Sequence, residues 1–303
     1  MSEYLGYNQI SFYIDSIEAQ IPCKIIGNKN TIITGFGLSN RSLYGKSYIT
    51  YCNSENYLEQ ALVNDKIKAI LLSYELLQSI PEKYLEEKSF VIVDYPETRF
   101  YELFNHTKFP YSDKPQTGLD AEIGSNTIIE EGVIIGNNVK IGHNSVIRYG
   151  TVIGNDVLIG SNVVIGGDGF QMIKDTNGKY MTIPHRGGVK IGNNVFIGDG
   201  TTIAKSLFDG YTEIGDDTKI SNQVAISHNC RIGRNCAIAA NATLFGSCEI
   251  KDNVWIAPAS SILNRVVVEE NAFICAHSFV SRNVPVGDKV FGIPAVSRYR
   301  NSK

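Results

Sequence analysis

The segment EIGSNTIIEEGVIIGNNVKIGHNSVIRYGTVIGNDVLIGSNVVIG, residues 122–166, carries an isoleucine at every sixth position. These isoleucines are Ile123, Ile129, Ile135, Ile141, Ile147, Ile153, Ile159 and Ile165, and a glycine follows most of them. A fixed period of six predicts a parallel β-helix, in which three short strands complete one coil. One aliphatic side chain of each hexad points inward, a small residue four positions later fills the remaining space, and Gly, Asn or Asp turns the corner.

The period continues to residue 280 with two interruptions. It resumes at Ile191 and, after a short insertion, runs from Ile214 to Val280. The longer interruption, residues 167–188, contains turn-forming residues and predicts a hairpin-like excursion, and the shorter covers residues 205–212. Because a rigid scaffold carries function on its loops, we expect both insertions to take part in the functional site, and the alternative for both is an insertion without a function.

The residues before the repeat predict a small α/β domain. Short β-rich runs at 23–27, 31–36, 47–52, 69–73 and 89–94 are joined by helical segments at 55–64 and 96–106, the second of which begins with Pro96. The predicted division is an α/β domain at 1–112, a linker at 113–118, a β-helix at 119–284 with its excursion at 167–188, and a tail at 285–303.

Composition excludes several classes of protein. Charged residues make up 19% of the chain and the net charge is −3, which is unlike the basic surface of a nucleic-acid-binding protein. The first residues, MSEYLGYNQI, lack the pattern of a signal peptide, and no apolar run reaches the ~18 residues of a membrane span. The six cysteines form no CxxC pair, and the five histidines are too far apart along the chain for a local metal motif. We therefore expect a cytoplasmic protein with no membrane span, no bound metal and no nucleic-acid partner.

His228 lies within an unbroken part of the repeat, QVAISHNCRIGRNCAIAANATLFGS, residues 223–247. Gly246 follows it by eighteen residues (246 − 228), so one full coil should place this glycine directly beside the imidazole. A histidine has an ordinary pKa of ~6.5 and can accept a proton at cellular pH. His228 is therefore a candidate general base, and the structural alternative is a solvated turn residue.

The order of three motifs resembles one family. GGDGF (166–170), TTIAKSLFDG (201–210) and ISNQVAISHNCRIG (220–233) are similar to segments of the UDP-3-O-acylglucosamine N-acyltransferases, which are left-handed β-helix (hexapeptide-repeat) acyltransferases of lipid A synthesis. The α/β half resembles the nucleotide-binding domain of that family. The resemblance implies a left-handed β-helix and a homotrimer with active sites between adjacent subunits.

The resemblance also implies roles for individual residues. His228 matches the general base, and the backbone N–H of Gly246 matches the donor to the oxyanion. Asn222 matches a residue that helps bind the sugar, and Tyr51 and Tyr57 match the aromatic pair that stacks on the base of the nucleotide. For Tyr51 and Tyr57, packing in the core of the α/β domain is the alternative.

Further residues are assigned to the acyl donor. Gly169 and Phe170, in GGDGF, match residues at the pantetheine channel, and Arg298 is a candidate for the phosphates of coenzyme A. Packing of the loop and a solubilising tail are the alternatives for Phe170 and Arg298. Where the family carries a second histidine, this chain has Asn264 or Arg265.

The C-terminal segment decides between two predicted activities. The lipid A enzymes end in a helical extension that contacts acyl carrier protein, whereas this chain ends after GIPA (292–295), a motif similar to those of acyltransferases that use acyl-CoA. The first prediction is therefore N-acyl transfer, and specifically N-acetyl transfer, from acyl-CoA (acetyl-CoA) to a dTDP- or UDP-linked amino sugar for lipopolysaccharide or O-antigen synthesis. The second is the UDP-3-O-(3-hydroxyacyl)glucosamine N-acyltransferase of lipid A synthesis, using acyl carrier protein.

Two other classes share the β-helix. A zinc carbonic anhydrase requires clustered histidines, and an ice-binding solenoid requires a flat repetitive face and no nucleotide domain. The scattered histidines argue against the first class, and the α/β half and the two insertions argue against the second.

Overall fold

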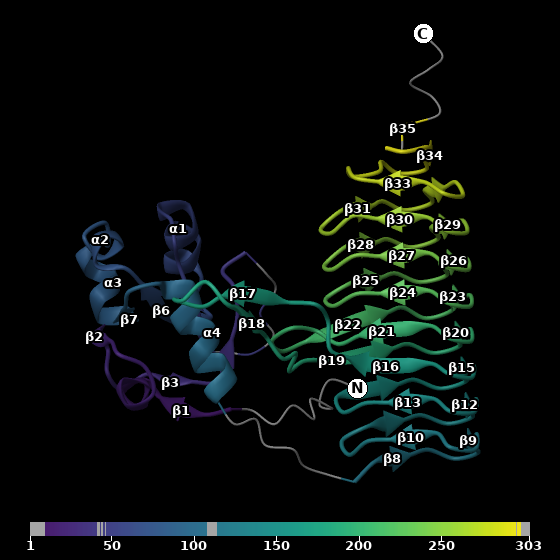
Figure 1. The fold of residues 1–303 in the computed structure, drawn as a ribbon, viewed down its shortest axis with the longest axis horizontal. Coiled ribbons are helices and arrows are strands. Elements are labelled where there is room, and N and C mark those ends of the chain that lie inside the picture. Colours follow the sequence, from purple (N-terminus) through teal and green to yellow (C-terminus); the bar gives the residue numbers. More distant parts are fainter. Residues whose placement is uncertain are drawn as a thin grey trace.

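A computed structural model describes residues 10–40, 43, 45, 47–107, 114–294 and 296–297. Figure 1 shows a small α/β domain beside a tall prism of stacked coils. The chain first forms the α/β domain, enters the prism at one end and climbs it coil by coil toward the C-terminus.

The α/β domain contains one five-stranded sheet. Its spatial order is β2 (Lys24–Gly27), β7 (Ser89–Ile92), β6 (Ile67–Leu72), β5 (Tyr48–Tyr51) and β4 (Gly35–Phe36). Strands β4 to β7 are parallel and β2 is antiparallel to β7. The helices are α1 (Glu55–Val63), α2 (Tyr74–Leu77), α3 (Glu82–Glu87) and α4 (Pro96–His106), and a short antiparallel pair, β1 (Phe12–Tyr13) and β3 (Ile32–Ile33), flanks the 3₁₀ helix Ile14–Ala19.

The predicted α/β character is confirmed, and each of the predicted runs contains a strand or a helix. The helix at 96–106 has the predicted bounds, with Pro96 in its first turn. The short helices α2 and α3 were not predicted. Neither buries any residue completely, so an apolar pattern that would reveal them is missing from the sequence.

The prism is a left-handed β-helix with three sheets, whose strands are parallel except that the last strand of the second sheet, β35, pairs antiparallel with β34. The first sheet contains β8 (Gln116–Thr117), β11 (Ile134–Ile135), β14 (Thr151–Ile153), β19 (Gly188–Ile191), β22 (Tyr211–Ile214), β25 (Arg231–Ile232), β28 (Glu249–Ile250) and β31 (Val267–Val268). The second contains β9 (Glu122–Ile123), β12 (Lys140–Ile141), β15 (Leu158–Ile159), β20 (Phe196–Ile197), β23 (Lys219–Ile220), β26 (Ala237–Ile238), β29 (Trp255–Ile256), β32 (Phe273–Ile274), β34 (Lys289–Phe291) and β35 (Val296–Ser297). The third contains β10 (Ile128–Ile129), β13 (Val146–Ile147), β16 (Val164–Gly167), β21 (Thr202–Ala204), β24 (Ala225–Ile226), β27 (Thr243–Leu244), β30 (Ser261–Ile262) and β33 (Phe279–Val280).

The inward positions of the hexads fill the core of the prism. Ile135, Ile141, Ile147 and their successors are buried and pack with the small or branched residues four positions later, such as Val139 and Val157. The corners adopt positive φ angles at Asn, Asp or Gly in most coils, as the turn chemistry predicts.

The β-helix extends beyond both predicted boundaries. Strand β8 pairs with β11 inside the segment predicted as a linker, and β34 pairs with β32 inside the predicted tail. The sequence did not reveal these strands because the exposed Thr117 replaces the aliphatic residue, and because Val290 falls outside the six-residue spacing.

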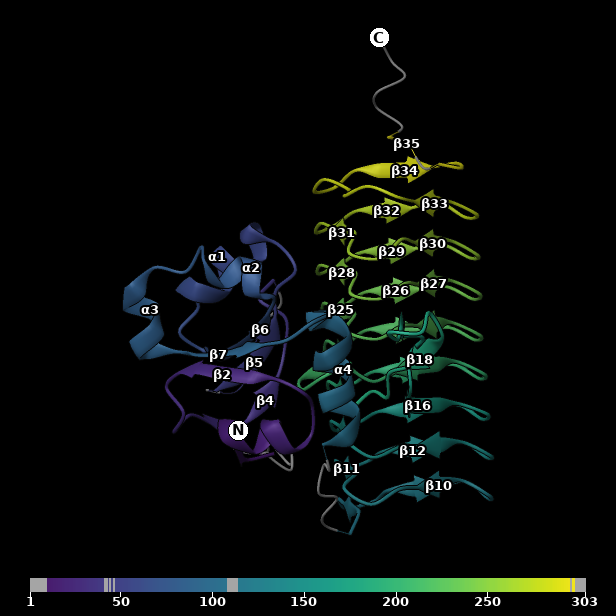
Figure 2. The ribbon, with the colours of Figure 1, turned by 60° about the vertical axis from the view of Figure 1, so that its left-hand side comes forward.

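Both insertions leave the prism along one edge, between the third and first sheets. The longer connects β16 to β19 and contains the antiparallel hairpin β17 (Met172–Lys174) and β18 (Tyr180–Thr182), which agrees with the predicted hairpin-like excursion. The shorter connects β21 to β22. Their apolar residues Ile183, Leu207 and Phe208 join the core of the α/β domain, and Figure 2 shows α4 alongside the prism at this junction. The insertions thus fix the α/β domain to this edge, which is called the junction edge below.

Candidate active site

Three successive corners of the junction edge follow the insertions. They occupy residues 227–230, 245–248 and 263–266, and each connects a strand of the third sheet to a strand of the first. The N–H of Ser247 donates to the carbonyl of His228 over 2.9 Å, and the N–H of Arg265 donates to the carbonyl of Gly246 over 3.2 Å. The eighteen-residue offset therefore does place Gly246 one coil from His228.

Hydrogen bonds at Asn229 fix the orientation of the His228 ring. The N–H of Leu207 donates to Oδ1 of Asn229 over 3.1 Å, and Nδ2 of Asn229 donates to Oγ of Ser206 over 2.6 Å. Nδ1 of His228 lies 3.0 Å from the same Oδ1, which can only accept. We therefore assign the proton of the neutral imidazole to Nδ1, so that Nε2 carries the lone pair that can accept a proton.

Two glycines lie against the edges of this ring. A Cβ atom built on Gly246 would lie 2.8 Å from Nε2 of His228, and one built on Gly169 would lie 2.7 Å from its Cδ2. Any larger residue at either position would displace the imidazole. The N–H of Gly246 also makes no hydrogen bond within the described part of the chain, so it is available to a ligand.

His185, in the longer insertion, is a close neighbour of His228. Its ring centroid lies 5.1 Å from that of His228, and the side chain is only 2% exposed. Burial, with the charge of His228 as a second cause, lowers the pKa of His185 to about 4. Asp168 and the backbone of Ile183 oppose the shift, but neither ring nitrogen reaches a hydrogen bond of ordinary geometry among the described residues.

The two insertions support His185 from both sides. The N–H of Arg186 donates to the carbonyl of Leu207 over 2.9 Å, and Nζ of Lys205 lies 3.1 Å from Oδ1 of Asp168. The sequence could not predict that His185 lies beside His228, because the insertions do not follow the six-residue period.

Asn222 does not lie beside His228 within one chain. It occupies the corner between β23 and β24, on another edge of the prism, where its Oδ1 accepts a hydrogen bond of 3.0 Å from the N–H of Asp199. Six residues span one face of the prism, whereas neighbours on one edge are eighteen residues apart. The two residues could meet only across a boundary between subunits.

The two tyrosines predicted to stack on the base, Tyr51 and Tyr57, differ in burial. The Tyr51 ring packs 5.2 Å from Phe100, and its hydroxyl donates to Oε1 of Glu97 over 2.7 Å. Burial raises the pKa of this hydroxyl. Tyr57, in the first turn of α1, is 41% exposed. The packing of Tyr51 agrees with the alternative of a core residue, and Tyr57 presents an accessible ring.

The residues predicted to contact the acyl donor have different positions. Gly169 lies against both histidine rings, because a Cβ atom built on it would lie 2.6 Å from Nε2 of His185 and 2.7 Å from Cδ2 of His228. Phe170 is 84% exposed next to it, so it does not act as an apolar anchor of the loop within this chain. Arg298 lies outside the described residues.

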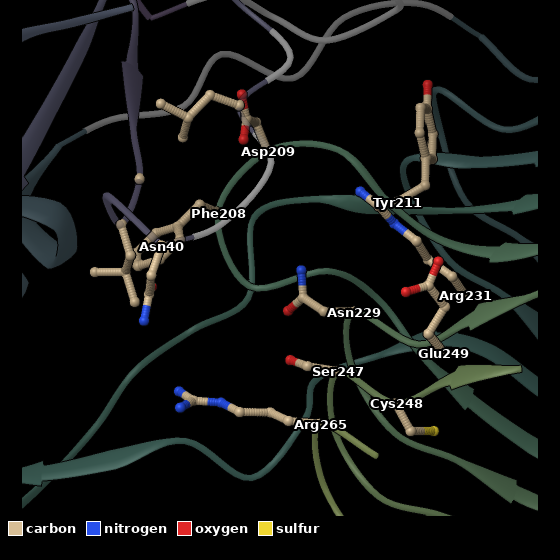
Figure 3. Close-up of a pocket in the computed structure, with 13 residues that line it drawn as sticks. Asn40, Phe208, Asp209, Tyr211, Asn229, Arg231, Ser247, Cys248, Glu249 and Arg265 are labelled. Carbon is tan, nitrogen blue, oxygen red and sulfur yellow. The ribbon is translucent and has the colours of Figure 1, made fainter. Parts of the chain in front are cut away.

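A cavity of about 340 Å³ opens between the α/β domain and the junction edge, and is called the junction cavity. Its lining comprises Gly37, Leu38, Asn40, Leu43, Phe208, Asp209, Tyr211, Asn229, Arg231, Ser247, Cys248, Glu249 and Arg265. Figure 3 shows Asn229 and Ser247 between Asn40 and Phe208 on one side and Arg231 and Glu249 on the other. The cavity thus adjoins the corners that hold His228 and Gly246.

Both acidic residues of the lining have hydrogen-bond donors. The hydroxyl of Tyr48 donates to Oδ2 of Asp209, and burial raises the pKa of Asp209 to about 6 in spite of this bond. Nζ of Lys251 donates to Oε1 of Glu249 over 2.6 Å. These contacts offset part of the negative charge on the wall of the cavity.

Within the described residues, no group of three or more His, Cys, Asp or Glu side chains is placed to hold a metal ion. No helix in that part of the chain is both long and apolar enough to cross a membrane.

Two family models match segments of this chain that lie within the prism. The bacterial transferase hexapeptide model matches residues 132–167, and the model of the GMPPB C-terminal domain matches residues 204–295. UDP-3-O-acylglucosamine N-acyltransferase 2 of Legionella pneumophila is 40% identical over 133 residues, which are 44% of this chain and 38% of the relative. The UDP-3-O-acylglucosamine N-acyltransferase of Campylobacter concisus is 38% identical over 42% of this chain and 40% of its own length. The chain thus spans about two-fifths of the length of these relatives.

Solved structures agree with these relatives. UDP-N-acetylglucosamine acyltransferase from Campylobacter jejuni superposes with a TM-score of 0.54 and 28% identity over 62% of this chain and 71% of that one. LpxA from Acinetobacter baumannii, at 21% identity, has a TM-score of 0.55 over 62% of this chain and 70% of that one, and supports the fold. The predicted resemblance is confirmed: the protein is a left-handed hexapeptide-repeat β-helix that resembles acyltransferases.

Proposed function

We propose that the protein is an N-acyltransferase that transfers an acyl group from a thioester to the amine of a UDP-linked glucosamine derivative. The observation that carries the proposal is the fixed His228 ring, whose Nε2 faces Gly246 while Nδ1 is bonded to Asn229. The names of the relatives support the UDP-linked acceptor, and they favour the second predicted activity, UDP-3-O-(3-hydroxyacyl)glucosamine N-acyltransferase, over acetyl transfer to a dTDP-linked sugar.

The reaction requires one base and one oxyanion donor. The neutral amine of the sugar attacks the thioester carbonyl, and Nε2 of His228 accepts the proton that the nitrogen loses. The N–H of Gly246 would donate to the oxyanion of the tetrahedral intermediate. Collapse of the intermediate forms the amide and expels the thiolate, which regains the proton from His228. General-base help of this kind contributes ~10²–10⁴ in rate, and an oxyanion donor contributes ~10²–10³.

The neutral His185 is suited to a place beside this base. Because its pKa is lowered, it adds no second positive charge when His228 takes up the proton. It also occupies space next to the ring that water would otherwise fill. His185 is therefore proposed as a positioning residue for His228.

A homotrimer is part of the proposal. Asn222 lies on a different edge from His228, so a site that uses both requires two subunits. Cross-linking or sedimentation measures the oligomeric state, and a protein that is monomeric and fully active would rule out Asn222 as a sugar-binding residue of this site.

The donor and the acceptor can be tested together. Thiol release is measured with 3-hydroxyacyl-acyl carrier protein and with acetyl-CoA, each against UDP-3-O-acylglucosamine and a panel of UDP- and dTDP-linked amino sugars. Turnover of UDP-3-O-acylglucosamine with the carrier-protein donor supports the proposal. Turnover only with acetyl-CoA and a dTDP-linked sugar would instead establish the first predicted activity, and absence of turnover with every pair would refute N-acyl transfer.

A further inference from the structure

We propose that the C-terminal end of the prism binds the surface of an anionic lipid bilayer. This end is formed by residues 282–297, which are called the end cap below, and a basic segment follows them in the sequence. The inference goes beyond the proposed function, because a bilayer is neither the donor nor the acceptor of the acyl group. Only the number of end caps on one particle rests on the proposed trimer.

The end cap closes the stack of coils. Its strand β34 pairs with β32 of the coil below, and β35 folds back antiparallel onto β34 as the last strand of the second sheet. Figure 1 shows both strands at the end of the prism, beyond β31 and β33. In the part of the chain that the structure describes, no further coil covers them. The last repeat of a solenoid normally has a polar outer face for this reason.

The end cap exposes large apolar side chains instead. Val286 is 65% exposed and Ile293 is 80% exposed, and they lie in the turns before and after β34. Phe291 and Val296, which are partners across β34 and β35, are 40% and 46% exposed. The turn with Ile293 connects these two strands, so the three residues around it are contiguous. Exposed apolar patches of this kind mark surfaces that contact another molecule.

Positive charge is concentrated in the same part of the chain. Residues 282–303 contain five Lys or Arg and one acidic residue, so their side chains carry a net charge of +4. The whole chain has a net charge of −3, so residues 1–281 carry −7 (−3 − 4). Three of the five basic residues follow Ser297 in a segment outside the described residues, and its six residues reach at most ~22 Å from the end cap.

The acidic groups of this region do not cancel that charge. In the end cap the acidic residue is Asp288, whose Oδ1 accepts hydrogen bonds of 2.9 Å from Oγ of Ser297 and of 2.7 Å from the N–H of Lys289. Acidic residues resume one coil below, at Glu269 and Glu270, where the carbonyl of Glu270 accepts a hydrogen bond from the N–H of Gly287. The basic surface is therefore confined to the end face of the prism.

This combination fits an anionic bilayer surface. Apolar side chains enter the boundary between headgroups and acyl chains, while Lys and Arg lie at the level of the lipid phosphates. Stable attachment generally requires both signals. The proposed site between Asn222 and His228 of adjacent subunits places the prisms side by side, so three end caps would face one bilayer. Three weak contacts on one particle bind far more tightly than one.

The test measures binding of the full chain to vesicles by co-sedimentation. Vesicles of phosphatidylcholine alone are compared with vesicles that also contain phosphatidylglycerol. We expect binding to the anionic vesicles, and we expect it to weaken as salt is raised from ~0.1 M to ~1 M, since the Debye length falls from ~10 Å to ~3 Å. Val286→Ser/Ile293→Ser should bind about 10-fold more weakly or less, because two apolar side chains no longer enter the bilayer. Arg282→Gln/Arg300→Gln should lose about 10-fold on anionic vesicles.

Leu119→Ser/Ile128→Ser is the matched control for the apolar variant. Leu119 and Ile128 lie on the first coil, at the opposite end of the prism, and are 75% and 57% exposed. This control removes the same amount of exposed apolar surface from the other end, so its vesicle binding should equal that of the wild type. Equal thermal midpoints of the variants and the wild type would show that all of them fold.

Several results would overturn the inference. These are no binding of the wild type to anionic vesicles, equal binding by Val286→Ser/Ile293→Ser and the wild type, or an equal loss in the control. A raised KM for the carrier-protein donor in Val286→Ser/Ile293→Ser, without vesicle binding by the wild type, would assign the end cap to a protein partner. Sedimentation without vesicles would assign it to a second copy of the chain if a larger assembly of the wild type were lost in that variant.

Vesicle binding is measured without donor or acceptor, so it is independent of turnover. Binding to anionic vesicles that the end-cap variants lose, together with no acyl transfer to any acceptor, would retain this inference and refute the proposed function. Acyl transfer by a protein that binds no vesicles would retain the proposed function and refute this inference.

Discussion

Replacement of Gly246 by alanine should move the His228 ring without unfolding the β-helix. The added Cβ would lie 2.8 Å from Nε2 and 2.9 Å from Cε1, whereas unstrained contacts are ~3.5–4.0 Å. The imidazole must therefore shift by ~1 Å, and its bond to Asn229 opposes the movement. A displacement of ~1 Å at a reacting group costs about 10²-fold in rate.

Stability should change much less than activity in this variant. Gly246 does not have a positive φ angle, so alanine meets no backbone penalty there. Overpacking typically costs ~1–3 kcal/mol, and a partly exposed ring can relax toward the low end of that range. The assay is kcat/KM for acyl transfer together with the free energy of unfolding from urea titration.

Gly167→Ala provides the control for Gly246→Ala. A Cβ on Gly167 would meet only Cγ1 of Val164, at 3.8 Å, which is an ordinary contact. We expect activity within about threefold of the wild type for this variant, because nothing must move. If Gly246→Ala also kept its activity within that margin, the reasoning that places the reaction at the Nε2 edge of His228 would be refuted.

Three further variants test two residues beside the ring and one residue of the junction cavity. Asn229→Ala should lower kcat/KM about 10- to 100-fold, because it removes the hydrogen-bond partner of Nδ1 of His228. It should also destabilise the protein by ~1–3 kcal/mol, because it leaves the N–H of Leu207 unpaired. Unchanged kinetics would contradict the assigned tautomer of His228. The folded-state pKa of His185, about 4, is below its ordinary 6.5, so its contribution of about 3 kcal/mol is present above pH 6.5 and is lost as pH falls toward 4. Urea titrations of His185→Gln across this range should lack that loss. The pKa of Asp209, about 6, is above its ordinary 3.8, so a contribution of about 3 kcal/mol is present below pH 3.8 and is lost as pH rises through 6. Asp209→Asn should remove this second dependence. The contributions of His185 and Asp209 to the free energy of unfolding change with pH in opposite directions, so this free energy should vary more steeply between pH 4 and 6 in each single variant than in the wild type. Parallel profiles for the wild type and both variants would contradict both assignments.

The β-helix could be predicted because the six-residue period of the sequence matches the repeating unit of the structure, one strand and one corner. Each hexad supplies one inward residue, so Ile147 or Ile238 reveals both the strand and its register. Where an aliphatic residue is missing, as at Thr117, or the spacing changes, as at Val290, the strand exists but the pattern does not show it. The short helices α2 and α3 escaped prediction for a similar reason, because they bury too little to require a periodic apolar face.

Only those parts of the site that lie on the six-residue repeat could be predicted. His228 and Gly246 are one coil apart, so arithmetic places them together. The same arithmetic separates Asn222 from His228 within a chain, so the sugar-binding role that the resemblance implies for Asn222 requires a second subunit. The position of His185 depends on the packing of two irregular insertions against the α/β domain, so it could not be derived from spacing.

The central claim is that Nε2 of His228 removes the proton of the attacking amine. It is tested most directly by the pH dependence of kcat/KM for acyl transfer to UDP-3-O-acylglucosamine, measured for the wild type and for His228→Gln. The account predicts that activity of the wild type falls at low pH as a single group is protonated, and that His228→Gln loses ~10²–10⁴ in rate together with this dependence. A His228→Gln variant with the rate and pH profile of the wild type would contradict it.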